Sequence, residues 1–321
     1  GRGLIRNSPP LEFQTALPIF RQQILKEINE EKHVNLFASK ENYRAQLMQK
    51  NIESYKVGAK GDIAPPIPKM PNNINMFKLA EEIKMGRFII PTGKNDNNLE
   101  PVLWDINKNP YLIVAGHIQS GKSTIVKSWI QLLVKEYSEE EVEIYAIDSN
   151  SMGLYEIMGL PHIISVNELK NIDDLVEMVK RELDIRRNEM NKCKKSRGDM
   201  ESLHESWKQI IFAIDNLNEF TDSGHYGLKE LMERIVKKEY GLKISIIAIG
   251  NINDLESNWD PFAKALRECQ VGLLLGSLKE QNIFNARLPY GSYEKDFEMG
   301  DGYFINKNKY VGLRTAYCFE D

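Results

Sequence analysis

Short apolar runs alternate with amphipathic helical patterns from about residue 76 to the end of the chain. The apolar runs are rich in β-branched residues and lie at 111–115, 142–147, 209–214, 243–249 and 271–275. Runs of this length and composition predict buried strands. Because strands that alternate with helices usually form a parallel sheet covered on both faces, the sequence predicts an α/β fold with a mostly parallel sheet.

Two of the intervening stretches show the period of an amphipathic helix. Residues 124–137 place apolar side chains at helical spacing, namely Ile125, Val126, Trp129, Ile130 and Leu133. A longer stretch from Ile172 to Met190 has one apolar face and is followed by the basic residues Lys192, Lys194, Lys195 and Arg197. This basic end is either a phosphate-binding patch or a solvated helix end favoured by the helix dipole, and the second interpretation is preferred.

The first 75 residues follow a different pattern. A hairpin-like start is followed by a polar helical segment at about 18–54 and by a proline-rich segment at 62–73. Closely spaced prolines cannot hold a helix, so the last segment is interpreted as a linker. The expected organisation is a hairpin, a helical segment and a linker over 1–75, and one folded domain over 76–321.

A partial internal repeat links the two ends of the chain. Gly1 to Ile5 with 11–17 resembles Gly300 to Phe304 with 313–317, and both pairs are expected to form β-hairpins. We therefore expect that the chain opens with the last hairpin of a preceding, similar module in a tandem array. Chance similarity is the alternative. The chain starts without methionine, which agrees with a piece of a longer protein.

Composition narrows the function classes. The chain has 321 residues, of which 42% are hydrophobic and 27% charged, and its net charge is −4. It contains no apolar run of about eighteen residues, and its first residues do not resemble a secretory signal. The three cysteines show no paired or metal-binding spacing, which favours a reducing compartment. The acidic balance argues against binding nucleic acid through its phosphates.

A phosphate-binding motif follows the first of these strands. Residues 116–123 read GHIQSGKS and fit the P-loop pattern G-x-x-x-x-G-K-[ST] between an expected strand and an expected helix. Its glycines let backbone N–H groups surround phosphates, Lys122 would reach the β and γ phosphates, and the Ser123 hydroxyl would bind magnesium. We therefore expect ATP and magnesium as ligands, although an accidental match is the alternative. The expected nucleotide-binding residues are Gly116, His117, Ile118, Gln119, Ser120, Gly121, Lys122, Ser123 and Thr124.

The second half of such a site is an acidic group at the end of another strand. Asp215 follows the run 209–214 and is the expected second magnesium ligand, so the expected catalytic residues are Lys122 and Asp215. Asn216 comes next, and an amide cannot accept a proton from the attacking water. Glu219 is doubtful as a substitute base, because one helical turn displaces it by about 5 Å. Asp148, after 142–147, lies either beside the P-loop or at a helix cap.

Several segments together resemble the FtsK/SpoIIIE family of P-loop motors. They are 111–124, 144–148, Leu160-Pro161-His162, Arg181 to Arg187 and Gly300-Asp301-Gly302. The resemblance covers about 76–321 and is strongest to the membrane-bound ATPases of Gram-positive type VII secretion. It implies a RecA-like domain in the cytoplasm as part of a bacterial cell-membrane protein. It also implies preceding ATPase modules in the same chain, a homo-hexameric ring, and recognition of secreted proteins through a C-terminal signal.

This sequence departs from the family pattern at three places. Asn216 stands where an acidic residue is usual, 248–251 lacks the usual polar sensor, and 271–275 lacks an arginine found in the DNA motors. These departures argue against fast hydrolysis and DNA translocation. The favoured function is a degenerate ATP-binding module of a type VII secretion motor that binds substrate proteins and makes no membrane contact itself. A DNA-translocating motor domain and a structural module with a relic P-loop are the alternatives.

Overall fold

The computed structural model describes residues 2–5, 11–14, 49, 53, 69–83, 86–150 and 152–319. The chain divides into two compact units, Gly1–Ile67 and Pro68–Asp321. In the first unit, strands β1 (Arg2–Ile5) and β2 (Leu11–Gln14) pair antiparallel, which confirms the predicted hairpin. Its turn, most of the polar helical segment and residues 62–68 of the expected linker lie outside the described residues, so the boundary at 75/76 stays a prediction.

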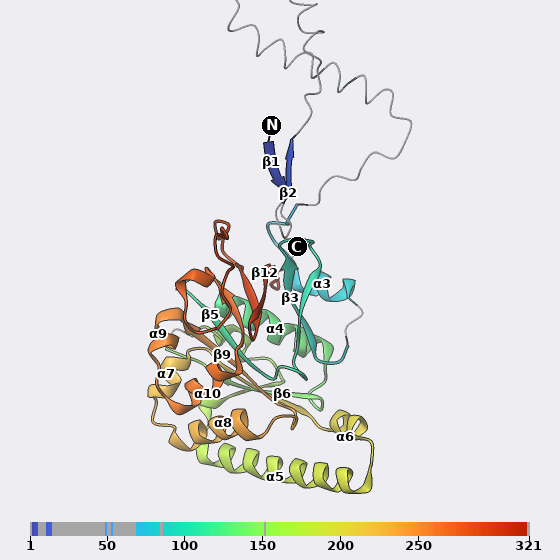
Figure 1. The fold of residues 1–321 in the computed structure, drawn as a ribbon. Coiled ribbons are helices and arrows are strands. Elements are labelled where there is room, and N and C mark those ends of the chain that lie inside the picture. The colour runs from blue at the N-terminus through green and yellow to red at the C-terminus, as the bar shows by residue number, and fades with distance from the viewer. Residues whose placement is uncertain are drawn as a thin grey trace, which may run out of the picture. The chain divides into compact units, whose positions relative to one another are not determined.

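The second unit is built on a ten-stranded sheet with the order β4-β3-β12-β11-β10-β5-β9-β8-β6-β7 (Figure 1). The parallel part consists of β10 (Val271–Leu275), β5 (Tyr111–Gly116), β9 (Ile244–Asn251), β8 (Gln209–Ile214), β6 (Val142–Ile147) and β7 (Ile163–Ser165). The antiparallel part consists of β3 (Ile89–Asn95), β4 (Pro101–Asp105), β11 (Asp301–Asn306) and β12 (Lys309–Thr315). The predicted α/β class and all five predicted strands are confirmed.

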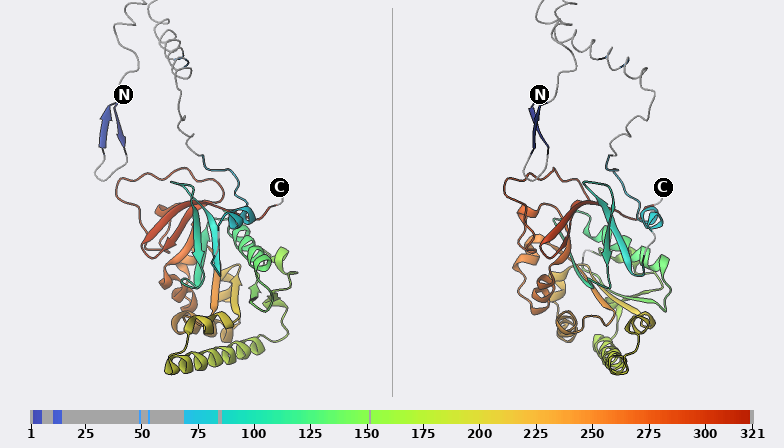
Figure 2. Two further views of the ribbon diagram at one scale, coloured as in Figure 1. Left: turned by 90° about the vertical axis from the view of Figure 1, so that its right-hand side faces the viewer. Right: turned by 45° about the vertical axis from the view of Figure 1, so that its right-hand side comes forward.

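Helices cover both faces of this sheet. They are α3 (Met76–Glu82), α4 (Lys122–Glu136), α5 (Ile172–Ser196), α6 (Met200–Ser206), α7 (Leu217–Asp222), α8 (Tyr226–Lys238), α9 (Ile252–Ser257) and α10 (Pro261–Cys269). Short 3₁₀ turns lie at Tyr155–Ile157, Val166–Glu168 and Leu278–Glu280. In the left view of Figure 2, the green α4 and the orange helices of residues 250–270 lie on opposite sides of the sheet.

The alternation of side chains along β5 explains the two layers. Ile113 and Ala115 pack into a core with α5, α7, α8, α9 and α10, whereas Leu112 and Val114 pack into a second core with α3 and α4. Successive strand residues point to opposite faces, so an all-apolar strand needs a helix layer on each side. The five apolar residues predicted for one face of α4 are all buried there, with Trp129 fully enclosed.

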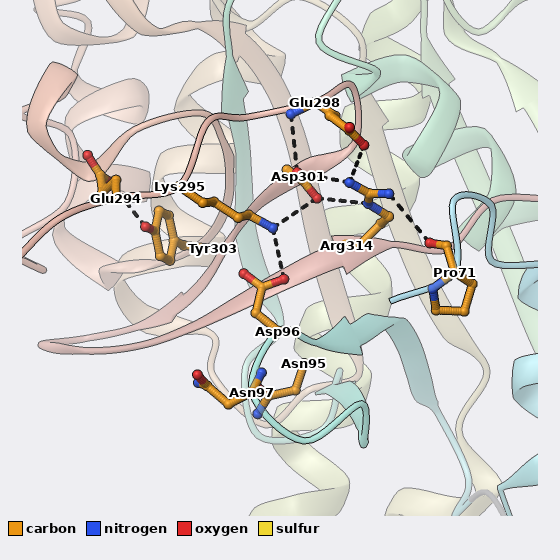
Figure 3. Close-up of polar contacts among 10 residues, drawn as sticks. All are labelled: Pro71, Asn95, Asp96, Asn97, Glu294, Lys295, Glu298, Asp301, Tyr303 and Arg314. Atoms are coloured by element: carbon orange, nitrogen blue, oxygen red, sulfur yellow. Dashed lines mark hydrogen bonds and ion pairs between the residues drawn. The ribbon is translucent and has the colours of Figure 1, made fainter. Parts of the chain in front are cut away.

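The hairpin of β11 and β12 confirms the second predicted hairpin, with Asp301 opposite Arg314. The long segment 276–300 between β10 and β11 is fixed to it by polar contacts (Figure 3). Glu294 accepts hydrogen bonds from the Leu278 N–H at 2.8 Å and from the Tyr303 hydroxyl at 3.1 Å. These contacts matter to the site because this segment starts beside the P-loop.

Candidate nucleotide-binding site

The loop between β5 and α4 has the backbone of an anion-binding turn. Gln119 and Gly121 have positive φ values of 62° and 96°. Gly121 is the N-cap of α4, and no side chain of the described residues caps that helix. A Cβ at Gly121 would meet nothing within 4 Å, so the backbone there faces open space. The first N–H groups and the positive dipole end of α4 are therefore available to a phosphate.

Gly116 is required by close packing at the start of the loop. A Cβ at this position would lie 2.5 Å from Ser120 Oγ and 2.8 Å from the carbonyl oxygen of Leu275 in β10. Any larger residue would push the loop away from the sheet. Ser120 Oγ itself is buried and has no hydrogen-bond partner within the described part of the chain. Buried hydroxyls usually have a partner, so this atom fits a loop that has space for a polar ligand.

The structure brings Lys122, Ser123 and Asp215 together. Ser123 Oγ donates a hydrogen bond to Asp215 Oδ1 at 2.9 Å, which joins the start of α4 to the end of β8. Lys122 Nζ donates to the carbonyl oxygen of His117 at 2.5 Å, within the loop. Burial lowers the pKa of Lys122, and the charges of Asp215 and Asp254 oppose this shift. Asp215 was expected here because it ends an apolar run, where a P-loop ATPase carries its second acidic group.

Two further residues around Asp215 were missed by sequence reasoning. Asp215 Oδ2 accepts a hydrogen bond from Ser149 Oγ, and Asp215 is only 5% exposed. A Cβ at Gly153 would collide with the same carboxylate, with Cγ at 2.8 Å. Both residues belong to the segment after β6. The edge placement inferred for Asp148 was the signal that could have pointed to this segment.

Asp148, Asn216 and Glu219 mainly order the local backbone. Asp148 Oδ1 accepts the N–H groups of Ser149 and Leu154, each at 3.0 Å, and it caps neither the 3₁₀ turn that follows nor α5. Burial raises the pKa of Asp148, with smaller contributions from the charges of Asp215 and Glu219. Asn216 is the N-cap of α7 and accepts the Glu219 N–H at 3.3 Å. Glu219 Oε1 accepts the N–H of Asn150 at 3.0 Å, and the expectation that Glu219 is doubtful as a base stays a prediction.

The strand between β5 and β8 and the helix that follows it each contribute one more polar residue. Asn251, the last residue of β9, pairs with Gly116 and donates to Asp254 Oδ2 at 3.1 Å. Since Asp254 acts electrostatically on Lys122, both residues belong to the neighbourhood of the P-loop. Sequence reasoning treated 248–251 only as a departure from a family pattern. The position of Asn251 at the end of an apolar run marked it as a residue of this edge of the sheet, although not its partner. On the other side, Glu280 lies 3.4 Å from His117 Nε2.

The donor set agrees with a magnesium-nucleotide site. Within the described ranges, no group of three or more His, Cys, Asp or Glu side chains could hold a metal ion. A magnesium ion bound with a nucleotide needs fewer protein ligands, because phosphate oxygens and waters complete its octahedron. The hydroxyl of Ser123 and the carboxylate of Asp215, already hydrogen-bonded to each other, fit that requirement.

Comparison with known proteins places this architecture in a family. The model of the FtsK/SpoIIIE family matches residues 81–246, more than half of the chain. This chain belongs to the FtsK/SpoIIIE family. The ESX secretion system protein YukB of Bacillus subtilis (strain 168) is 24% identical over 262 residues, which cover 79% of this chain and 16% of YukB. This chain therefore spans only a small part of the length of YukB.

Solved structures support the same fold. ATPases 2 and 3 of EssC from Geobacillus thermodenitrificans match with a TM-score of 0.68 at 19% identity, over 90% of this chain and 52% of that one. ATPases 2 and 3 of EccC from Thermomonospora curvata, in complex with a signal sequence peptide, match with a TM-score of 0.63 at 18% identity, over 84% and 48%. The fold of this family member is thus that of a RecA-like P-loop ATPase. None of its described helices is long and apolar enough to cross a membrane.

Proposed function

We propose that this chain is an ATP-binding module of a type VII secretion ATPase, which binds substrate proteins and couples its nucleotide state to export. The observation that carries this proposal is the uncapped start of α4 beside the hydrogen-bonded pair Ser123 and Asp215. The family membership adds a P-loop ATPase framework. The relatives among ESX secretion proteins indicate which process such a framework serves.

The residues of the loop take distinct parts in nucleotide binding. Backbone N–H groups from Gly116 to Thr124 surround the phosphates, favoured by the dipole of α4. Lys122 leaves the His117 carbonyl, which it contacts at 2.5 Å, and reaches the β and γ phosphates. Ser123 and Asp215 would hold a magnesium ion, and a bound ion would supply neutralisation of the charge on the phosphate oxygens.

Hydrolysis by this module is proposed to be very slow. Asn216 follows Asp215 directly, and its amide oxygen caps α7 by accepting the Glu219 N–H. An amide cannot take a proton from the attacking water, and general-base catalysis typically contributes about 10²–10⁴-fold to a rate. The module would then act mainly by binding nucleotide and only to a small extent by hydrolysing it.

The proposed partners are secreted proteins and the other ATPase modules of a longer, membrane-bound chain. The structure of EccC that resembles this fold contains a signal sequence peptide, and the matching EssC structure contains ATPases 2 and 3 in one chain. We place this module on the cytoplasmic side of a bacterial cell membrane, in a homo-hexameric ring with preceding modules. The chain's net charge of −4 favours a protein substrate over nucleic acid.

Calorimetry with magnesium and a slowly hydrolysed ATP analogue tests the nucleotide site. Lys122→Ala should weaken binding by about 1.5–3 kcal/mol, or roughly tenfold to a hundredfold, because a charge-assisted contact is lost. Lys135→Ala is the matched control, since Lys135 lies near the end of the same helix and its side chain is 51% exposed. No binding by the folded wild type at millimolar nucleotide would refute the proposal. Salt-dependent binding of duplex DNA would instead favour a translocase.

A further inference from the structure

The geometry points to Ser149 as a positioning residue that holds the Asp215 carboxylate in place for magnesium. This inference rests on the proposed nucleotide-binding function and assigns a role to a residue outside the P-loop. The two side chains are buried together at the ends of β6 and β8, with Ser149 9% and Asp215 5% exposed. β6 and β8 are direct neighbours in the sheet. Their last residues, Ile147 and Ile214, pair with each other, and Ser149 and Asp215 follow shortly after them in the chain.

The two oxygens of Asp215 are held by donors from different elements. Oδ1 accepts the hydroxyl of Ser123, from the start of α4, at 2.9 Å. Oδ2 accepts the hydroxyl of Ser149, from the segment after β6. The terminal torsion of an aspartate is broad, so its orientation is set by the hydrogen bonds that it accepts. Donors on both oxygens restrict the rotation of the carboxylate and favour the orientation in which Oδ1 faces Ser123.

Ser149 is itself fixed by hydrogen bonds of the described residues around it. Asp148 Oδ1 accepts the N–H groups of Ser149 and Leu154, each at 3.0 Å. The N–H of Asn150 donates to Glu219 in α7 at 3.0 Å, which ties the segment to the element that follows Asp215. The backbone on either side of Ser149 is therefore held by Asp148 and Glu219, with the Ser149 hydroxyl directed at Asp215.

Gly153 lets its own backbone lie directly against the Asp215 carboxylate. A Cβ at residue 153 would overlap Asp215 Oδ1 and lie 2.8 Å from both Cγ and Oδ2. An alanine here would force either this backbone or the carboxylate to move. Ser149 and Gly153 thus act on the same group, one by donating a hydrogen bond and the other by leaving room for it.

The consequence concerns the magnesium-dependent part of nucleotide affinity. Phosphate binding by the loop and Lys122 does not require Asp215, whereas the metal does. Removal of the Ser149 hydroxyl should leave affinity in EDTA within twofold of wild type. It should reduce the gain in affinity on adding magnesium by about tenfold, since the carboxylate loses its fixed orientation and keeps a buried oxygen with one donor fewer.

The experiment measures dissociation constants for a slowly hydrolysed ATP analogue, with magnesium and with EDTA. Ser149→Ala should lose most of the magnesium gain, and Ser149→Thr should restore it because the hydroxyl returns. Ser149→Cys is a second variant of similar size whose thiol is a weak donor, so it should behave like Ser149→Ala. Ser202→Ala is the control. Ser202, in the exposed helix α6, also donates its hydroxyl to an aspartate, Asp199, at 2.7 Å.

The outcomes separate this inference from the proposed function. A magnesium gain within twofold of wild type in both Ser149→Ala and Ser149→Cys would overturn the positioning role while leaving nucleotide binding intact. An equal loss of affinity in EDTA and in magnesium would also overturn it, because that pattern indicates general damage to the loop. A folded wild type that binds nucleotide under neither condition would overturn the proposed function and the inference with it.

Discussion

Replacing Asp301 with asparagine should destabilise the second unit of this chain by about 3 kcal/mol. The Asp301 side chain is 1% exposed and lies at the centre of a charged cluster on β11 and β12 (Figure 3). It accepts hydrogen bonds from Arg314 Nε at 2.9 Å and Nη2 at 3.1 Å, and from the Glu298 N–H at 3.1 Å. Lys295 Nζ lies 3.1 Å from the same carboxylate. Asparagine keeps the shape but presents an NH₂ group to these donors.

The size of the expected destabilisation depends on which ion pair Arg314 retains after Asp301 is replaced. Breaking one partner out of a buried ion pair costs about 3–5 kcal/mol, because an uncompensated charge is left behind. Arg314 is 11% exposed and would retain Glu298, at 2.5 Å. Glu298 is 72% exposed, and exposed pairs contribute about 0–1 kcal/mol. The expected loss therefore lies at the lower end of the buried range.

The same cluster makes stability sensitive to acid. Burial alone would raise the pKa of Asp301, but hydrogen bonds from Arg314, the Glu298 N–H and Lys295 outweigh it and lower that pKa below its ordinary value. A carboxyl with a lower pKa in the folded state contributes stability that is complete above its unfolded value, near 3.9. That contribution is lost as the pH falls through the folded pKa. Asp301→Asn should lack this component.

Urea denaturation at pH 7 and at about pH 3 measures both effects. The control is Asp296→Asn, an exposed carboxylate in the same segment, which should change the free energy of unfolding by less than about 0.5 kcal/mol. A loss of less than about 1 kcal/mol in the free energy of unfolding of Asp301→Asn at pH 7 would contradict the proposed role of the buried ion pair. An equal loss of stability on acidification in the variant and in wild type would contradict the proposed role of the Asp301 pKa.

The remaining predictions concern turnover and association. The wild-type chain should release phosphate from ATP very slowly, and Asn216→Glu should raise that rate if only the base is missing; robust wild-type hydrolysis abolished by Lys122→Ala would contradict this. Because Asn216 caps α7, Asn216→Glu should also cost about 1 kcal/mol in urea denaturation, whereas Asn216→Asp keeps a good cap and should lose only what repulsion from Asp215 costs. The isolated chain should be monomeric or weakly associating in light scattering, since tandem modules raise local concentration; a stable hexamer at micromolar concentration would refute this.

Five of the six parallel strands were predictable because their signal is local. Each of the five is a mainly apolar run, and β5, β8 and β10 are buried along their whole length. The sixth, β7, has only three residues and was not predicted. β3 and β4 were not predicted, since β3 contains Pro91 and Gly93 and its register shifts at that point. β3 gains its place by pairing with β12, more than two hundred residues later in the chain. A pairing over that separation leaves no periodic trace in either segment.

The residues of the nucleotide site also fall into those that a local pattern predicts and those that only the assembled sheet brings together. The P-loop is a contiguous motif, and Asp215 was found because it ends an apolar run. Ser149 and Gly153 depend on β6 lying next to β8, and Asn251 depends on β9 lying between β8 and β5. Strand order is a property of the assembled sheet, so no pattern within one segment could assign these residues to Asp215 or to Gly116.

The electrostatics around Asp215 bear on why an amide stands at position 216. Burial raises the pKa of Asp148, and the charges of Asp215 and Glu219 raise it further, so the acidic groups at this edge of the sheet already disfavour the ionised form of Asp148. A carboxylate at residue 216 would add a like charge directly beside a carboxylate that is 5% exposed. In a module that hydrolyses ATP, a base in that position would compensate for this repulsion through its effect on the rate. In a module whose task is to bind magnesium-nucleotide, the amide caps α7 without the repulsion, and it leaves Asp215 as the charged partner of Ser123 and Ser149.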